Sequence, residues 1–149
     1  MRGQRGSRIP AHGARRMGVI VILAALVFLG GCDEKPVGPT AEEVGTRFYE
    51  ALKRGDFAAA AALYVDKMPR EQIIAELEEN RSQLGDLQQY NLKDVVTNTV
   101  FSGRRYILKY KTRYTSQHAT EGLILFQPVS DNIIRIEAHN VRTRGTRGP

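Results

Sequence analysis

The spacing of apolar residues changes at Gly85, and this change most constrains the fold. Between Thr40 and Leu84 apolar residues recur every three or four positions, as on a helix that packs by one face. After Gly85 they alternate with polar residues, as on strands with one covered face. A chain with this order is expected to form an α+β domain in which helices cover one face of a sheet.

The helical half contains two or three predicted helices, delimited by capping residues. A capping box of Thr40 and Glu43 begins the first helix, and Asp56 is suited to cap a short alanine-rich one. Pro69 suits the first turn of a third helix. We expect these helices over residues 41–54, 57–64 and 69–84.

The second half predicts four strands joined by short turns. Short connections place consecutive strands side by side and antiparallel, which gives a meander. The domain is therefore predicted over residues 40–143, as helices packed on a curved four-stranded antiparallel sheet, with a disordered tail at 144–149. The strands are expected over residues 90–101, 104–115, 120–129 and 133–143.

The positive charge of the chain is concentrated in its first 31 residues. The net charge is +6, but residues 1–31 contain five arginines and no acid. The remainder carries 17 basic and 16 acidic residues, which gives no electrostatic case for binding nucleic acid. An uninterrupted apolar run of 11 residues, 19–29, follows the arginines. It is too short for a bilayer-spanning helix, which needs about 20 residues, and is typical of a signal peptide.

The segment Leu29-Gly30-Gly31-Cys32 resembles the lipobox of bacterial lipoproteins. The resemblance implies cleavage between Gly31 and Cys32 and fatty acylation, with chains such as palmitate, of Cys32. Residues 32–39 are polar and proline-rich, which predicts an exposed tether rather than a buried thiol. We expect a membrane-anchored protein of the cell envelope that faces the periplasm or the exterior. Asp33 resembles the residue that keeps many enteric-type lipoproteins in the inner membrane.

The domain also resembles the nuclear transport factor-like superfamily, or cystatin-like cone fold, which includes ketosteroid isomerase. The segment that carries the resemblance is residues 47–60, an aromatic helix, a Gly-Asp break and a small-residue helix. The resemblance implies a cone that can enclose a pocket, and pairing of two copies through the exposed sheet face.

The predicted second strand offers the main candidate site. Tyr106, Tyr110 and Tyr114 share one face, so they are candidates to line a pocket for a small hydrophobic ligand; the alternative is a plain core layer. The other face carries a basic row that either binds an anionic partner or pairs with neighbouring acids. Basic residues of this row are Arg105, Lys109, Lys111 and Arg113.

The remaining candidates for chemistry are few. Asp94, Glu121 and His139 are expected on strands, with the direction of the two acids undetermined, and His118 is expected in a hairpin loop. These residues form no recognisable catalytic set, metal site or cofactor motif. We therefore expect a non-enzymatic lipoprotein that binds a small hydrophobic ligand or an envelope protein. An isomerase- or hydrolase-like enzyme is the alternative, and it requires an acid or imidazole inside the cone beside a tyrosine donor.

Overall fold

The computed structural model describes residues 38–143. The predicted signal peptide, the predicted lipidated tether up to residue 37 and the predicted disordered tail lie outside these residues. Between residues 38 and 143, the helices lack the length and hydropathy that a bilayer span requires. The elements are α2 (Ala41–Arg54), α3 (Phe57–Ala61), α4 (Arg70–Leu84), β1 (Leu87–Val100), β2 (Gly103–Tyr114), β3 (His118–Pro128) and β4 (Arg135–Thr143).

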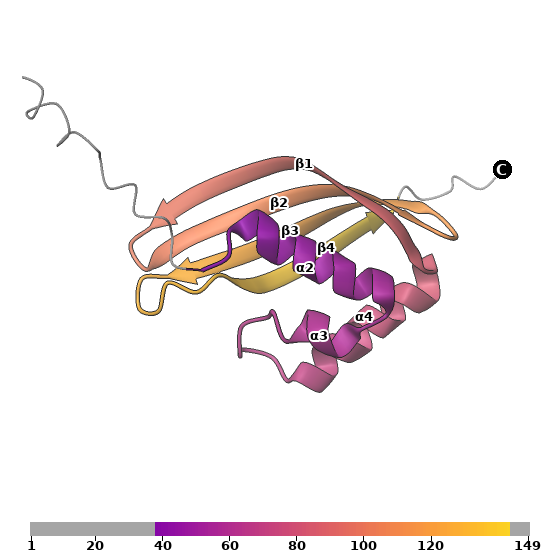
Figure 1. The fold of residues 1–149 in the computed structure, drawn as a ribbon, viewed down its shortest axis with the longest axis horizontal. Helices are drawn as coiled ribbons and strands as arrows, with labels where there is room; N and C mark the ends of the chain where they lie inside the picture. The colour runs from indigo at the N-terminus through magenta and orange to yellow at the C-terminus, as the bar shows by residue number, and fades with distance from the viewer. Residues whose placement is uncertain (1–37, 144–149) are drawn as a thin grey trace, which may run out of the picture. The chain divides into compact units, whose positions relative to one another are not determined.

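The four strands form one antiparallel sheet in the order β1-β2-β3-β4. The sheet curves around the helices, which lie on its concave side (Figure 1). This arrangement confirms the predicted α+β fold of helices on a four-stranded meander. It divides the strand residues into an inner face, which α2 contacts, and an outer face, which no described helix covers.

Local signals in the sequence position α2 and α3. The Thr40 side chain accepts a hydrogen bond from the Glu43 backbone, and the Glu43 carboxylate accepts one from the Thr40 backbone, so the predicted capping box is confirmed. Gly55 ends α2 with a left-handed φ of 71°. The Asp56 side chain then accepts a hydrogen bond from the Ala59 backbone and begins α3.

Several predicted boundaries were wrong. Strand β1 begins at Leu87 rather than at residue 90, and β4 begins at Arg135 rather than at residue 133. Two of the other errors have a tertiary cause. Helix α3 ends at Ala61 rather than at residue 64, because Tyr64 forms a bridge with Ile136 of β4. His118 is the first residue of β3 and not part of a loop, because the hairpin closes through the Tyr114 N–H and the Gln117 carbonyl. Pro69 precedes α4 as its N-cap instead of lying in its first turn.

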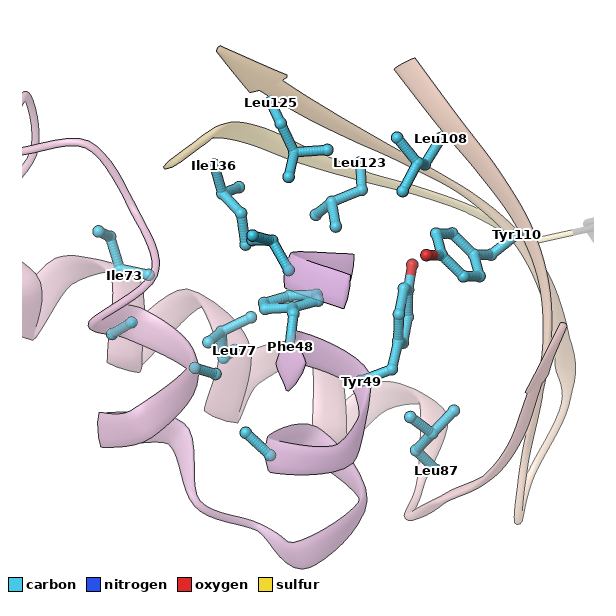
Figure 2. Packing of buried hydrophobic residues seen from close by; sticks show 14 of the residues in the cluster. Phe48, Tyr49, Ile73, Leu77, Leu87, Leu108, Tyr110, Leu123, Leu125 and Ile136 are labelled. Atoms are coloured by element: carbon cyan, nitrogen blue, oxygen red, sulfur yellow. The ribbon is translucent and has the colours of Figure 1, made fainter. Parts of the chain in front are cut away.

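The core lies between α2 and the inner face of the sheet. Phe48 and Tyr49, both fully buried, point from α2 towards the strands (Figure 2). The Tyr49 ring packs on the Tyr110 ring with centroids 4.3 Å apart. Aromatic rings thus fill the centre of the concave face. Other fully buried members of this layer are Leu108, Leu123, Leu125 and Ile136.

Replacing Gly45 in α2 by alanine is expected to lower the free energy of unfolding by about 1–3 kcal/mol. In an exposed helix the same change stabilises by about 1 kcal/mol. Here the helix approaches β2 so closely that a Cβ at position 45 would overlap the Tyr110 hydroxyl and lie 3.0 Å from Leu108 Cδ2. Urea denaturation measures the sign of the change, and an increase in stability would contradict this packing.

Candidate functional site

A carboxylate, Glu121, is buried on the inner face of β3, with only 1% of its surface exposed. Its Oε1 accepts hydrogen bonds from the Thr112 hydroxyl at 2.6 Å and the Tyr114 hydroxyl at 2.7 Å. Its Oε2 accepts one from the Tyr49 hydroxyl at 2.9 Å and lies 2.7 Å from His139 Nε2. We call these five residues the Glu121 cluster. All four acceptor positions of the carboxylate are occupied by side chains of the protein itself.

Four elements bring the Glu121 cluster together. Glu121 lies on the same face of β3 as Ala119, Leu123 and Leu125, all of them buried, so this strand directs it inward. Tyr49 comes from α2, 72 positions earlier in the chain. The remaining members lie on the adjacent strands β2 and β4.

The cluster keeps its carboxylate ionised and its phenols protonated. Burial alone raises the pKa of Glu121, but the hydrogen bonds and charge from His139, and the hydroxyls of Thr112 and Tyr114, outweigh it and leave the pKa below its usual value of 4.5. Burial, followed by the nearby negative charge of Glu121, raises the pKa of Tyr49 and of Tyr114 well above the usual value. At neutral pH both tyrosines therefore act as hydrogen-bond donors.

His139 is the one member with an unused polar atom. Its side chain is 4% exposed, and its Nδ1 is buried without a hydrogen-bond partner in the described part of the chain. His139 and Tyr114 also line a cavity of about 20 Å³ against Leu52, Leu77 and other helical residues. This volume holds one water molecule, whereas a cavity that binds benzene measures about 150 Å³. A space of this volume therefore fits water rather than an organic ligand.

Acidification is expected to destabilise the fold through Glu121. Because its folded-state pKa is lowered, Glu121 contributes full stability above its ordinary value of 4.5, and this contribution is lost as the pH falls further through the folded-state pKa. The melting temperature should therefore fall below about pH 4.5. Glu121→Gln, which cannot titrate, should flatten this part of the profile. An unchanged slope in that variant would contradict the assignment.

The domain is similar to solved structures of low sequence identity. A protein from Thiobacillus denitrificans, provisionally assigned as a calcium/calmodulin-dependent protein kinase type II association domain, matches with a TM-score of 0.53 and 14% identity; the match covers 74% of this chain and 99% of that one. An NTF2-like protein of unknown function in nutrient uptake from Rhodospirillum rubrum matches with a TM-score of 0.50 and 16% identity, over 71% and 99% of the two chains. The domain has the NTF2-like fold. No family model and no curated protein matches the sequence.

The three tyrosines predicted to line a pocket all lie on the inner face of the NTF2-like domain, but each has a different environment. Tyr110 packs in the core, and its burial raises its pKa to about 12. Tyr114 belongs to the Glu121 cluster and lines the small cavity. Tyr106 is half-buried and donates a hydrogen bond to the Gln127 side chain at 2.8 Å. The inward alternation of β2 agrees with the sequence analysis, although the three side chains enclose no common pocket among the described cavities.

On the outer face, some residues of the predicted basic row form ion pairs with acidic residues and others do not. Lys109 pairs with Asp94 at 2.8 Å, and Arg105 pairs with Glu137 at 3.1 Å, as on an ordinary solvated sheet surface. Asp94 is thereby placed on the outer face, away from the Glu121 cluster. Within residues 38–143, Lys111 makes no ion pair with an acidic residue.

A basic hollow lies at the end of the sheet where β2 turns into β3. Its volume is about 560 Å³, and Lys111, His118 and Arg142 contribute to its lining. Lys111 and Arg142 lie on either side of Thr120 in register, so the sheet itself holds them on one face. No group of three or more His, Cys, Asp or Glu residues in the described part could hold a metal ion. The hollow thus offers cations to an anionic group.

The Glu121 cluster is the part of the site that sequence analysis did not assemble. Glu121 and His139 were candidates, but Tyr49 and Thr112 were not. Ala119, Glu121, Leu123 and Leu125 occupy every second position, and this spacing was a usable signal that the acid points inward with the apolar residues. No comparable signal linked a helical tyrosine to it.

Proposed function

We propose that this protein is a lipid-anchored lipoprotein of the cell envelope whose NTF2-like domain binds a partner without catalysing a reaction. The proposal of an anchor is supported by the resemblance of residues 29–32 to a lipobox and by the polar tether that follows. Two or more acyl chains on Cys32 would hold the domain at the membrane durably, because each buried methylene contributes about 0.8 kcal/mol. Asp33 favours the inner membrane for this anchor.

The anchor is tested by Cys32→Ser expressed in the native host. We expect the unaltered protein in the membrane fraction, with an acylated Cys32 at its amino terminus by mass spectrometry. The serine variant should lack lipid and should either stay unprocessed or leave the membrane after washing. An unmodified Cys32 within an intact precursor would refute the anchor.

The observation that carries the binding role is the filled interior of the cone. Glu121 has no acceptor position left for a substrate, and the adjacent cavity of about 20 Å³ admits only water. General acid–base catalysis requires a substrate within hydrogen-bonding distance of the catalytic group, directly or through one water. A partner is better accommodated on the surface of the domain than inside it.

The basic hollow is the surface site that we assign to this partner, and its lining favours an anionic envelope component such as a cell-wall polymer. Lys111→Glu together with Arg142→Glu should weaken cosedimentation of the protein with purified cell walls of the host. Lys53→Glu together with Arg54→Glu, at exposed positions on α2, is the charge-matched control and should bind normally. Equal cosedimentation of both variants would remove the hollow from the proposal.

An enzyme is the second candidate, and the unpartnered Nδ1 of His139 is the observation that favours it. The structure fulfils one requirement of this alternative, because a carboxylate and an imidazole face the interior beside two tyrosine donors. A substrate would need α4 to move away and enlarge the cavity. A histidine NMR titration with 4-nitrophenol tests it: a saturable shift of the His139 Nδ1 resonance supports the alternative, and no shift argues against it.

The outer face supports pairing of two copies. Val96, Ile107, Ile124 and Ala138 form an apolar row across all four strands, and none of them is fully buried. A second copy placed over this row would remove it from water. Light scattering should show a dimer that Ile107→Lys combined with Ile124→Lys converts to a monomer; a monomeric unaltered protein contradicts the pairing.

A further inference from the structure

Exposed apolar side chains gather at one end of the sheet. Seven large apolar residues are exposed within residues 38–143, and four of them lie in the β1–β2 turn and the β3–β4 loop or directly beside them: Val100, Phe101, Val129 and Ile133. The two connections lie next to each other, because the Val129 N–H donates to the Ser102 carbonyl at 3.1 Å. We call residues 100–102 and 129–133 the apolar tip.

The apolar tip contributes little to the folded core. Phe101 is as exposed as a free side chain (105%), and Val129 is 76% exposed. Tight turns ordinarily carry Gly, Asn, Asp or Ser at such positions, because these residues suit the backbone and water. A cluster of exposed apolar side chains marks a surface that contacts an apolar partner.

The chain enters the domain at this same end. Helix α2 runs away from the tip. Its early residue Gly45 lies against Leu108, and Tyr49 reaches Glu121. Its later residue Leu52 lines the cavity beside His139 together with Leu87, at the opposite end of the sheet. In Figure 1 the start of α2 lies by the two connections that form the tip. Thr40, where α2 is capped, is therefore on the tip side of the domain.

If Cys32 carries the proposed anchor, on which this inference rests, the tether is short compared with the sheet. The tether comprises residues 32–39. Eight residues reach at most about 29 Å when fully extended. The sheet, with 12 residues in β2, is about 40 Å long. A lipid on Cys32 would therefore hold the tip end of the domain closest to the bilayer.

We propose that the apolar tip inserts into the membrane interface, so that the domain docks on the lipid surface instead of swinging on its tether. Phe101, Val129 and Ile133 are the inserted side chains. Arg104 is exposed immediately after the turn and can contact lipid phosphates. The basic hollow, at the opposite end of the sheet, then faces away from the membrane.

The absence of tryptophan from the sequence allows a direct test. Phe101→Trp is placed in the full acylated protein and reconstituted into phosphatidylcholine vesicles with brominated acyl chains, which quench tryptophan at the acyl boundary. The matched control is His118→Trp, at an exposed position at the opposite end of the sheet. We expect a blue-shifted emission at position 101 that loses most of its intensity in brominated vesicles, and an unshifted, unquenched emission at position 118.

Each other outcome overturns the proposal in a distinguishable way. Acylated Cys32 with equal emission at both positions removes the tip insertion and leaves the anchor intact. A blue shift at position 101 without quenching means that a protein, such as a second copy of this chain, covers the tip. A Cys32 without lipid overturns the anchor, and the tip proposal fails with it.

Discussion

Replacing Glu121 by alanine is expected to lower the free energy of unfolding by about 3–5 kcal/mol, which approaches the whole stability of a domain of this size. The change removes the shared acceptor of the Glu121 cluster. The hydroxyls of Thr112, Tyr49 and Tyr114 and the Nε2 of His139 would then remain in the core without a common partner. Urea denaturation followed by circular dichroism measures the loss.

Two further variants separate the loss of the hydrogen bonds of the Glu121 cluster from the loss of side-chain volume. Glu121→Gln keeps the shape and half of the acceptor capacity, so its loss should be clearly smaller than that of the alanine variant. Asp94→Ala removes a carboxylate of the exposed outer face and should leave stability almost unchanged. An alanine variant at position 121 with the stability of the unaltered protein would show that the Glu121 cluster is not formed.

Replacing Phe48 by alanine is expected to lower the free energy of unfolding by about 3–5 kcal/mol through a cavity instead of a broken network. Phe48 is fully buried, and its ring lies edge-on to Tyr49 and His139, with centroids 5.2 and 5.0 Å away. Neighbours on two layers surround the site, so it can collapse only in part. The new space would adjoin the small cavity beside His139.

Two phenylalanine variants serve as controls for this effect. Phe48→Leu retains most of the volume and should lose less than about 1.5 kcal/mol. Phe101→Ala removes the same side chain from the exposed apolar tip and should leave stability in solution unchanged. Equal losses from Phe48→Ala and Phe101→Ala would contradict the placement of Phe48 in the core.

The sequence by itself determined the elements and their order. The capping box of Thr40 and Glu43 and the Gly55-Asp56 break are local, because each hydrogen bond joins residues only a few positions apart. The change in the spacing of apolar residues at Gly85 is also readable from the sequence, because it reflects only which side of each element faces water. These signals sufficed to predict two or three helices on a four-stranded meander.

Only the tertiary structure decided which side chains contact one another inside the domain. Tyr49 and Glu121 meet across 72 positions, and their contact depends on the angle at which α2 crosses the sheet. Irregularities in register at Leu92/Asp94 and Ile124/Leu125 reverse the faces of later residues, so alternation could not be extrapolated along β1 or β4. His139 lies beyond the second irregularity. Its place beside Glu121 follows from strand pairing, which no local pattern specifies.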